Sequence, residues 1–364
     1  MSFPSCHGVV IGYNRLAAAR GVVSSSRYYC HCSTRRLRVI LRSMGLVAFM
    51  KFPNGAGNWK RVLWMAAKYG LSLLCLIYAF RGVSFTDLLS VLKRYPISPM
   101  LGVLAVSFMA YAVMGLRLSY MTVPPLPFRS TFRATLAGLA INNVLPAKAG
   151  EVAKAVWLGR DNGISPQKTL GIVFMERFFD VNVLALLSLW FLWNMGERKA
   201  VVFFVVCLTV GWGILTLFHL RPSWAEGFAG LFGRGRIHRF VSQALMGVLE
   251  NMSLGRLAWL SVTSLAVWFF YSLQMTLGIN AVAKLGLPWS TTLSIFAISA
   301  LGMLLPSSPG AFGVYEIVAL TALKRSGIGP DEALALALFT HMAQFVPVTL
   351  AGVAVCAAFP AKRS

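Results

Sequence analysis

The sequence predicts an all-α polytopic integral membrane protein with about six spanning helices and two hairpins broken by proline and glycine. Three observations indicate this fold class: 57% of the 364 residues are hydrophobic, only 12% are charged, and the apolar residues occur in long runs. Such a composition excludes a disordered chain, a disulfide scaffold and a soluble globular enzyme. The formal net charge of +23 does not indicate nucleic-acid binding, because a basic protein that binds nucleic acid in water exposes many charges on a polar surface.

Residues 1–60 form a basic segment that we expect to lie outside the membrane. They contain no Asp or Glu, the first of which is Asp87, and they are rich in Arg and Ser. This composition resembles a targeting peptide, but we favour a disordered basic tail, or a start at Met44 or Met50, over that interpretation. The Cys-His-Cys run at 30–32 lacks the separated ligand pairs of a zinc site, so we expect no metal and no cofactor.

Residues 61–360 are expected to form a single membrane domain. A bilayer core about 30 Å thick requires about 20 mainly apolar residues for each spanning helix. Six segments meet this requirement, and two further apolar stretches are interrupted by proline and glycine. The six segments are 62–80, 99–120, 170–194, 200–220, 257–282 and 332–359, and the interrupted stretches are 133–158 and 290–323.

The loops predict the orientation of this domain, because cytoplasmic loops carry an excess of Lys and Arg. With the N-terminus inside, and each interrupted stretch entering and leaving on one side, only eight of the 34 Lys and Arg fall in outer loops. We therefore expect a protein of the cell inner membrane with both termini in the cytoplasm. The longest inner loop, 221–256, is basic and has apolar residues at helical spacing, so it is either an amphipathic helix on the inner leaflet or a solvated connector.

The two interrupted stretches resemble each other, which predicts an internal repeat. The first contains Leu-Pro-Ala-Lys-Ala-Gly-Glu at 145–151, and the second contains Leu-Pro-Ser-Ser-Pro-Gly-Ala-Phe-Gly-Val-Tyr-Glu at 305–316. Each continues as an apolar helix and a short loop that ends in proline. Eleven residues beyond that proline stand Arg177 in the first copy and His341 in the second.

Three full spans separate the two copies, and three is odd, so the copies enter the membrane from opposite faces. The halves are 61–194 and 200–360. Paired broken segments in two inverted halves indicate the substrate site of a transporter, because irregular backbone in hydrocarbon is stable only where protein or a wet cavity surrounds it. The alternative is that proline and glycine merely kink packed helices.

Charged residues in or beside the apolar segments are candidates for this site, because an unpaired charge at such a position costs about 3 kcal/mol or more. Glu176 and Asp180 share a helix face, and Arg177 is spaced to pair with Asp180. The group is either a structural ion-pair cluster or a site where Arg177 holds a lipid phosphate, since a planar guanidinium fits a phosphate. Arg117, at the inner end of its span, is expected to snorkel toward headgroups.

Both interrupted stretches also offer a helix N-terminus beside glycine, which is favourable for an anion. In the first, Lys148 and Gly150 precede or open a helix that starts near Glu151. His341, the only histidine away from the ends of a predicted span, is either a hydrogen-bonded packing residue or a proton-coupling group. The candidate headgroup-binding residues are Asn142, Asn143, Lys148, Gly150, Glu151, Lys154, Glu176, Arg177, Asp180, Ser307, Ser308, Gly310, Gly313, Glu316 and His341.

The run 142–151, followed by Glu176-Arg177 and Asp180 and then by the run 306–316, resembles the lysylphosphatidylglycerol synthase transmembrane-region family, also called the flippase-like or UPF0104 family. The resemblance covers about residues 60–358. It implies an integral inner-membrane protein that moves lipids or lipid-linked intermediates between leaflets. Some relatives carry a fused aminoacyl-transferase domain, and we expect this stand-alone membrane region to perform no lysyl transfer.

Three hypotheses follow for the function. The leading one is a lipid flippase-like transporter of an anionic lipid or lipid-linked intermediate, with no catalytic residue. The second is a scaffold for an envelope-lipid or glycan biosynthesis enzyme, bound through the 221–256 loop. The third is a membrane-embedded glycosyl or acyl transferase that uses the buried acids, although the sequence contains no nucleotide-sugar motif. None of the three includes a nucleic-acid partner.

Overall fold

The computed structural model describes residues 70, 73–81, 85–145, 148–194, 196–303 and 308–359. These residues contain helices and connecting turns and no strand, which confirms the predicted all-α class. The basic segment 1–60, the Cys-His-Cys run within it and Ser307 lie outside the described residues.

In the part of the chain that the structure describes, four helices are long and apolar enough to cross a membrane. They are α5 (Ile97–Met121), α9 (Arg198–Leu220), α12 (Leu254–Leu277), which continues through the π-helical turn η1 (Gly278–Val282), and α15 (Pro330–Ala358). Helix α8 (Pro166–Asn194) matches the 29 residues of α15, but three charged residues interrupt its apolar sequence. Of the predicted span 62–80, residues 73–80 are described and helical.

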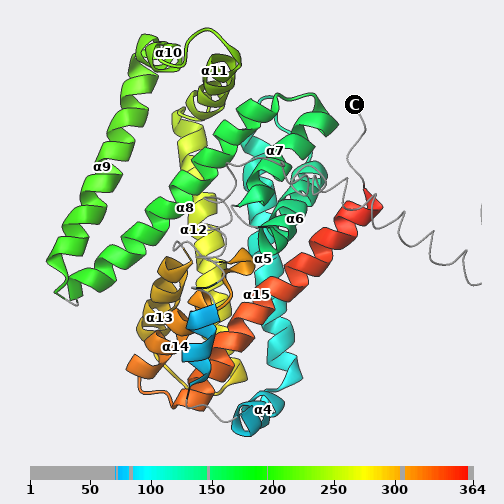
Figure 1. The fold of residues 1–364 in the computed structure, drawn as a ribbon, viewed down its shortest axis with the longest axis vertical. Coiled ribbons are helices and arrows are strands. Elements are labelled where there is room, and N and C mark those ends of the chain that lie inside the picture. The colour runs from blue at the N-terminus through cyan, green and yellow to red at the C-terminus, as the bar shows by residue number, and fades with distance from the viewer. Residues whose placement is uncertain are drawn as a thin grey trace, which may run out of the picture.

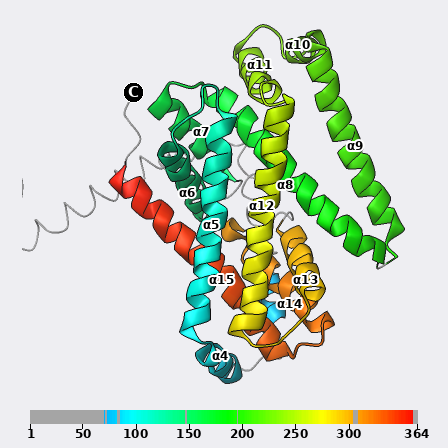
Figure 2. The same ribbon diagram turned by 180° about the vertical axis from the view of Figure 1, so that it is seen from behind.

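The two interrupted stretches are helical hairpins, and the predicted breaks lie between their helices. The first consists of α6 (Phe128–Val144) and α7 (Ala149–Asn162). The second consists of α13 (Trp289–Gly302), the short 3₁₀ turn η2 (Pro309–Ala311) and α14 (Val314–Arg325). Figures 1 and 2 show the first hairpin at the end of the molecule that holds α11, and the second at the opposite end, near α4.

Glycine allows the first hairpin to close tightly. A Cβ atom at Gly150 would collide with the carbonyl oxygen of Gly138 on α6 and would lie 2.7 Å from Asn142 Oδ1. Helix α6 also packs on α15, where a Cβ atom at Gly352 would collide with the carbonyl oxygen of Leu136. Helix α6 is therefore enclosed between α7 and α15, which fixes the tip of the hairpin near the middle of the molecule.

The predicted 221–256 loop is helical and forms a pair of short helices at the periphery of the molecule. Helix α10 (Pro222–Gly230) leads into α11 (Arg236–Leu249), which packs on α8 through Gly247 and Val248. Ile237 and Phe240 on α11 are exposed. Helix α9 stands away from the body in Figure 1 and contacts α8 through Trp212, whose Nε1 donates a hydrogen bond to Asn182 Oδ1 over 2.7 Å.

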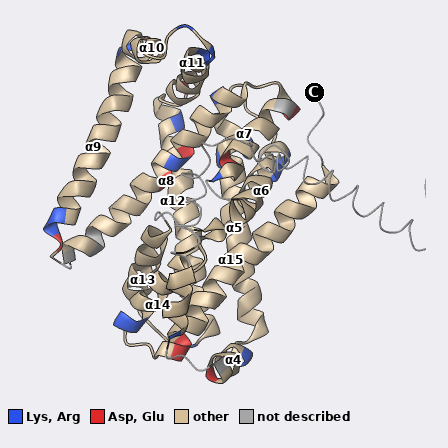
Figure 3. Ribbon diagram, in the orientation of Figure 1, with Lys and Arg blue, Asp and Glu red and all other residues tan. Residues whose placement is uncertain are grey.

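A further helix, α4 (Phe85–Arg94), fills a stretch where the sequence predicted only a connector. It lies across the end of α15 and its Leu88 is buried in the core around α13–α15. Most charged residues gather at the two ends of the molecule, and one further group lies inside, where α8 passes α7 (Figure 3).

Candidate functional site

The internal charged group is centred on Arg117 of α5, whose side chain is 0% exposed. Its Nη1 lies 2.7 Å from Asp180 Oδ1 and 2.8 Å from Ser264 Oγ, and its Nε lies 3.3 Å from Glu176 Oε1. The expectation that Arg117 snorkels to headgroups is therefore wrong. Two carboxylates on one face of α8 and a hydroxyl on α12 satisfy the guanidinium in the interior instead.

Two more cations complete the group. Lys154 Nζ on α7 lies 2.7 Å from Glu176 Oε2 and 3.4 Å from Glu151 Oε2. Arg177 lies 2.8 Å from Glu151 Oε1 and 3.2 Å from Asp180 Oδ2. We call these six residues the first cluster: it joins three bases and three acids from α5, α7 and α8, namely Arg117, Lys154, Arg177, Glu151, Glu176 and Asp180.

The second hairpin holds a smaller polar pair that we call the second pair. Glu316 is 0% exposed, and its Oε1 lies 2.6 Å from Nδ1 of His341, which is 3% exposed. The other ring nitrogen, Nε2, lies 2.8 Å from the carbonyl oxygen of Gly310. The second carboxylate oxygen of Glu316 accepts a hydrogen bond from the Gly313 amide over 2.7 Å, which closes the first turn of α14.

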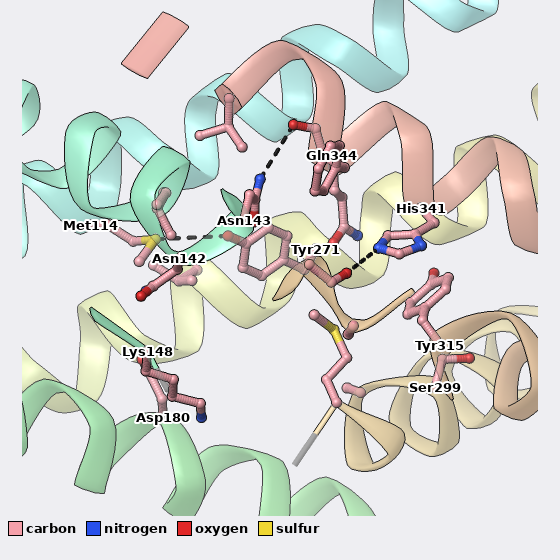
Figure 4. Close-up of a pocket in the computed structure, with 18 of the residues that line it drawn as sticks. Met114, Asn142, Asn143, Lys148, Asp180, Tyr271, Ser299, Tyr315, His341 and Gln344 are labelled. Carbon is pink, nitrogen blue, oxygen red and sulfur yellow. Dashed lines mark hydrogen bonds between the residues drawn. The ribbon is translucent and has the colours of Figure 1, made fainter. Parts of the chain in front are cut away.

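A cavity of about 810 Å³ lies between the two hairpins and is lined by α5, α8, α12 and α15 as well. Figure 4 shows Lys148 and Asp180 on one side of it and His341 and Tyr315 on the other. Most of its lining is apolar. The apolar side chains that line it include Met114, Leu139, Val181, Val267, Met275, Phe296 and Val348.

The structure brings most of the predicted candidates to this cavity. The predicted residues that line it are Asn142, Asn143, Lys148, Glu151, Arg177, Asp180, Ser308, Gly310 and His341. Asn143 Nδ2 also donates to Thr349 Oγ1 over 2.8 Å, and so ties the end of α6 to α15. The predicted pairing of Arg177 with Asp180 is present.

Other predicted candidates lie outside the cavity lining. The Gly150 amide donates to Asn142 Oδ1 over 2.7 Å and the Gly313 amide donates to Glu316, so neither amide is free for an anion. Lys154 is buried between two acids and does not line the cavity. Helix packing and ion pairing account for these residues.

Lys148 differs from the other cations of this region. It precedes α7 with a left-handed backbone (φ 52), its side chain is exposed, and it lines the cavity. No ion pair joins it to another of the described residues. Arg177 is also partly open, with 37% of its side chain exposed. These two side chains give the cavity a basic end.

Sequence reasoning missed Arg117, Gln274 and Gln344. Gln344 Nε2 on α15 donates to Gln274 Oε1 on α12 over 2.7 Å, and Gln344 lines the cavity. A polar or charged residue inside an apolar span is rare and faces protein or water rather than lipid. That signal was available for all three residues.

This geometry defines a class of protein: a polytopic α-helical membrane protein whose two broken hairpins meet around an internal cavity with charged walls. The chain belongs to the lysylphosphatidylglycerol synthase TM region family, whose sequence model matches residues 65–352.

Individual relatives are distant. A UPF0104 membrane protein of Methanocaldococcus jannaschii is 24% identical over 223 residues, which cover 58% of this chain and 91% of that protein. A UPF0104 membrane protein of Methanothermobacter thermautotrophicus is 25% identical over 263 residues, or 66% of this chain and 77% of that protein. A phosphatidylglycerol lysyltransferase of Staphylococcus haemolyticus is 35% identical over 73 residues, which are 20% of this chain and only 9% of that protein.

Proposed function

We propose that the protein moves an anionic lipid, or a lipid-linked intermediate with an anionic headgroup, between the two leaflets of the cell inner membrane. The observation that carries the proposal is the cavity between the hairpins, with Lys148 and Arg177 at one end and a mainly apolar lining. The proposal includes no catalytic step, and the membership in a membrane family with a lipid-related name supports it.

The charges at the basic end favour an anionic headgroup. The first cluster pairs three bases with three acids, and Lys148 adds a positive charge that forms no ion pair with an acid among the described residues. Two of the acids, Glu151 and Asp180, also line the cavity, and both are held by Arg177. The partly exposed guanidinium can form parallel hydrogen bonds to a phosphate.

The mainly apolar lining of the cavity suits the hydrocarbon part of a lipid. Its volume of about 810 Å³ falls in the range of ligand pockets, which are lined mainly by apolar side chains with a few polar groups that fix orientation. Tyr271 adds a side chain with both apolar and polar parts: its ring lines the cavity, and its hydroxyl contacts Met114 Sδ at 3.7 Å.

An inverted repeat supports transport. Glu151 is the third residue of α7 and Glu316 is the third residue of α14. The two carboxylates contact Arg177 at 2.8 Å and His341 at 2.6 Å, which occupy equivalent places in α8 and α15. Each of those helices begins with proline and has 29 residues. We infer that the halves are inverted copies and that they rock around the cavity, as transporters of this kind do.

We propose that the end with α10 and α11 faces the cytoplasm, as do both termini. The exposed Arg234, Arg236 and Arg239 lie in this segment, and basic residues at the inner surface are attracted to anionic lipid.

The experiment is to measure transbilayer movement of fluorescent phosphatidylglycerol in vesicles that contain the purified protein. Removing Lys148 from a membrane-facing anion site costs about 1 kcal/mol, so Lys148→Ala should slow this movement about fivefold. Lys199→Ala removes an exposed lysine at the far end of α9 and is the matched control. Unchanged movement in both Lys148→Glu and Arg177→Ala, with the fold intact, would overturn the site.

A second candidate is the scaffold for an envelope-biosynthesis enzyme. Exposed aromatic and aliphatic side chains on α9–α11 favour it: Phe203, Trp224, Phe228, Leu231, Phe232, Ile237 and Phe240. Deleting 222–249 and repeating both the vesicle assay and a pull-down separates the two functions. If the deletion variant loses its partners in the pull-down but still moves lipid in vesicles, this surface serves as a scaffold.

A further inference from the structure

The hydrogen bonds of His341 specify how many protons the second pair holds. The Gly310 carbonyl oxygen can only accept a hydrogen bond, so Nε2 of His341, 2.8 Å away, must carry a proton. Nδ1 lies 2.6 Å from a Glu316 oxygen, and that bond also needs one proton, either on the ring or on the carboxyl group. The pair therefore holds one proton more than a neutral imidazole and a carboxylate hold together.

Loss of that proton breaks one of the two contacts. A neutral imidazole has a single N–H, so after proton loss a nitrogen lone pair faces either the Gly310 carbonyl oxygen or the Glu316 carboxylate. Both arrangements are repulsive, and Glu316, which is fully buried, keeps an unpaired negative charge. The bonds that hold the second hairpin against α15 thus depend on the protonation of this pair.

The proton held by the second pair is next to the cavity, and the contact between His341 and Gly310 lies in the wall of the cavity. His341, Gly310 and Ser308 line the cavity. Gly310 has a left-handed backbone (φ 69), and a Cβ atom there would lie 2.5 Å from the Phe345 ring, so the η2 loop is seated closely against α15. Release of Gly310 from His341 would free the loop that closes this side of the cavity.

The surroundings of the pair contain few other titratable groups. Helix α14 presents Tyr315, whose hydroxyl contacts Thr340 Oγ1 at 3.1 Å. Helix α5 presents Tyr111, which donates to the Gln344 carbonyl oxygen, and Tyr95 beside α4 packs on Phe339. On α6, Arg133 stacks on Phe359 at the far end of α15. The remaining titratable groups of the cavity wall are Tyr271 on α12 and Lys148, Glu151, Arg177 and Asp180 at its basic end.

We infer that the Glu316–His341 pair binds the proton that drives lipid movement. The inference rests on the proposed function and adds its coupling ion. In the protonated state the pair holds η2 and α14 against α15, as in this structure. When the proton leaves to water in the cavity, the Gly310 contact breaks and the second hairpin loosens, so that one proton is bound and released in each cycle.

Thermodynamics supplies a direct test of coupling. In vesicles with a pH difference of about one unit, a carrier that moves one proton with each lipid changes the steady-state leaflet ratio of the lipid by up to ~10-fold, because one unit is a tenfold difference in proton activity. An uncoupled protein leaves the ratio unchanged. The probe is fluorescent phosphatidylglycerol in vesicles containing the full chain.

We expect His341→Gln and Glu316→Gln to abolish the response of the leaflet ratio to the pH difference, because a glutamine amide forms hydrogen bonds but does not titrate. His219→Gln, an exposed histidine at the end of α9, should keep the response. If the wild-type protein equilibrates lipid but its leaflet ratio does not respond to the pH difference, the proton site is overturned and the proposed function stands. The same conclusion follows if the leaflet ratio responds fully in both glutamine variants.

A second readout does not require transport. Met303 follows α13, is exposed and lines the cavity, so a Met303→Cys variant with its other cysteines replaced reports on the second hairpin. The cysteine at position 303 is labelled with a membrane-impermeant maleimide, and a Phe203→Cys control on α9 corrects for the thiolate content at each pH. The corrected labelling should rise with pH, and His341→Gln should remove the rise. If wild-type protein moves no lipid but shows this dependence, the transport proposal fails and the proton site stands. Labelling with no such dependence overturns the proton site.

Discussion

Glu151 of the first cluster and Glu316 of the second pair are each the third residue of the second long helix of their hairpin, but the two groups differ in chemistry. The first cluster has six charged side chains, and its bases are two arginines and one lysine. The second pair has one acid and one histidine, a side chain that can bind and release a proton. The two sides of the cavity thus carry different chemistry, a cluster of paired charges on one side and a single contact between an acid and a histidine on the other.

The largest effect expected from this comparison is the loss of Arg117. Arg117→Met leaves Glu176 and Asp180 buried without their shared partner, and breaking such a buried pair costs about 3–5 kcal/mol. We expect the free energy of unfolding, measured in detergent, to fall by that amount. Arg239→Met, on the exposed face of α11, is the control. Equal stability of the two variants would show that the first cluster does not hold the fold together.

A smaller effect is expected from Gly150→Ala at the first hairpin. The added Cβ collides with backbone oxygen of Gly138, which cannot rotate away, so overpacking should cost about 1–3 kcal/mol. The comparable change in the second hairpin, Gly302→Ala, meets only the side chain of Val318 and should cost less. Gly213→Ala on α9, where nothing lies within 4 Å, serves as the control for helix propensity. Thermal unfolding of the three variants should follow this order, and a reversed order would contradict the packing.

The second pair should contribute less to stability than the first cluster. In His341→Gln the amide can still donate to the Gly310 carbonyl oxygen, so we expect a loss of about 1 kcal/mol. Stability of the wild-type protein should depend on pH more than stability of this variant does. A loss as large as that of Arg117→Met would mean that the second pair is a structural anchor rather than a proton-dependent contact.

The smallest effect is expected at the surface. Lys168 Nζ on α8 lies 2.8 Å from Glu250 Oε1 next to α11, and both side chains are partly exposed. Exposed ion pairs contribute about 0.2–1 kcal/mol, so Lys168→Ala should lower the free energy of unfolding by no more than this. Added salt should reduce the difference further, whereas the cost of Arg117→Met should change little with salt. A strong salt dependence of the Arg117 variant would show that the first cluster is open to solvent.

The sequence predicted the elements of the fold better than their contacts. Long apolar runs predicted α5, α9, α12 and α15, and proline and glycine predicted both breaks. These predictions succeeded because each depends only on residues that are close together in the sequence. The pairing of Arg177 with Asp180 was also predictable, since three residues along a helix bring side chains together.

Contacts between helices were not predictable in the same way. The partners of Arg117 stand 59 and 63 residues away in the sequence, so a charge near the end of a span was read as facing headgroups. Gly150 was read as a free helix terminus because nothing local shows that Asn142 accepts its amide. Helix α4 was missed because ten residues are too few for an apolar span.

The central claim is that the cavity between the hairpins accepts an anionic lipid, and a photo-crosslinking amino acid tests it most directly. Val181 follows Asp180 on α8, lines the cavity and is 41% exposed, while Phe203 on α9 is 64% exposed. Benzoylphenylalanine is placed at either position, and the protein is inserted into vesicles of phosphatidylethanolamine and phosphatidylglycerol. After crosslinking, mass spectrometry gives the ratio of captured phosphatidylglycerol to captured phosphatidylethanolamine. We predict about fivefold enrichment of phosphatidylglycerol at position 181 over position 203, equivalent to about 1 kcal/mol from one lysine. Equal ratios at the two positions would contradict an anionic-lipid site in the cavity.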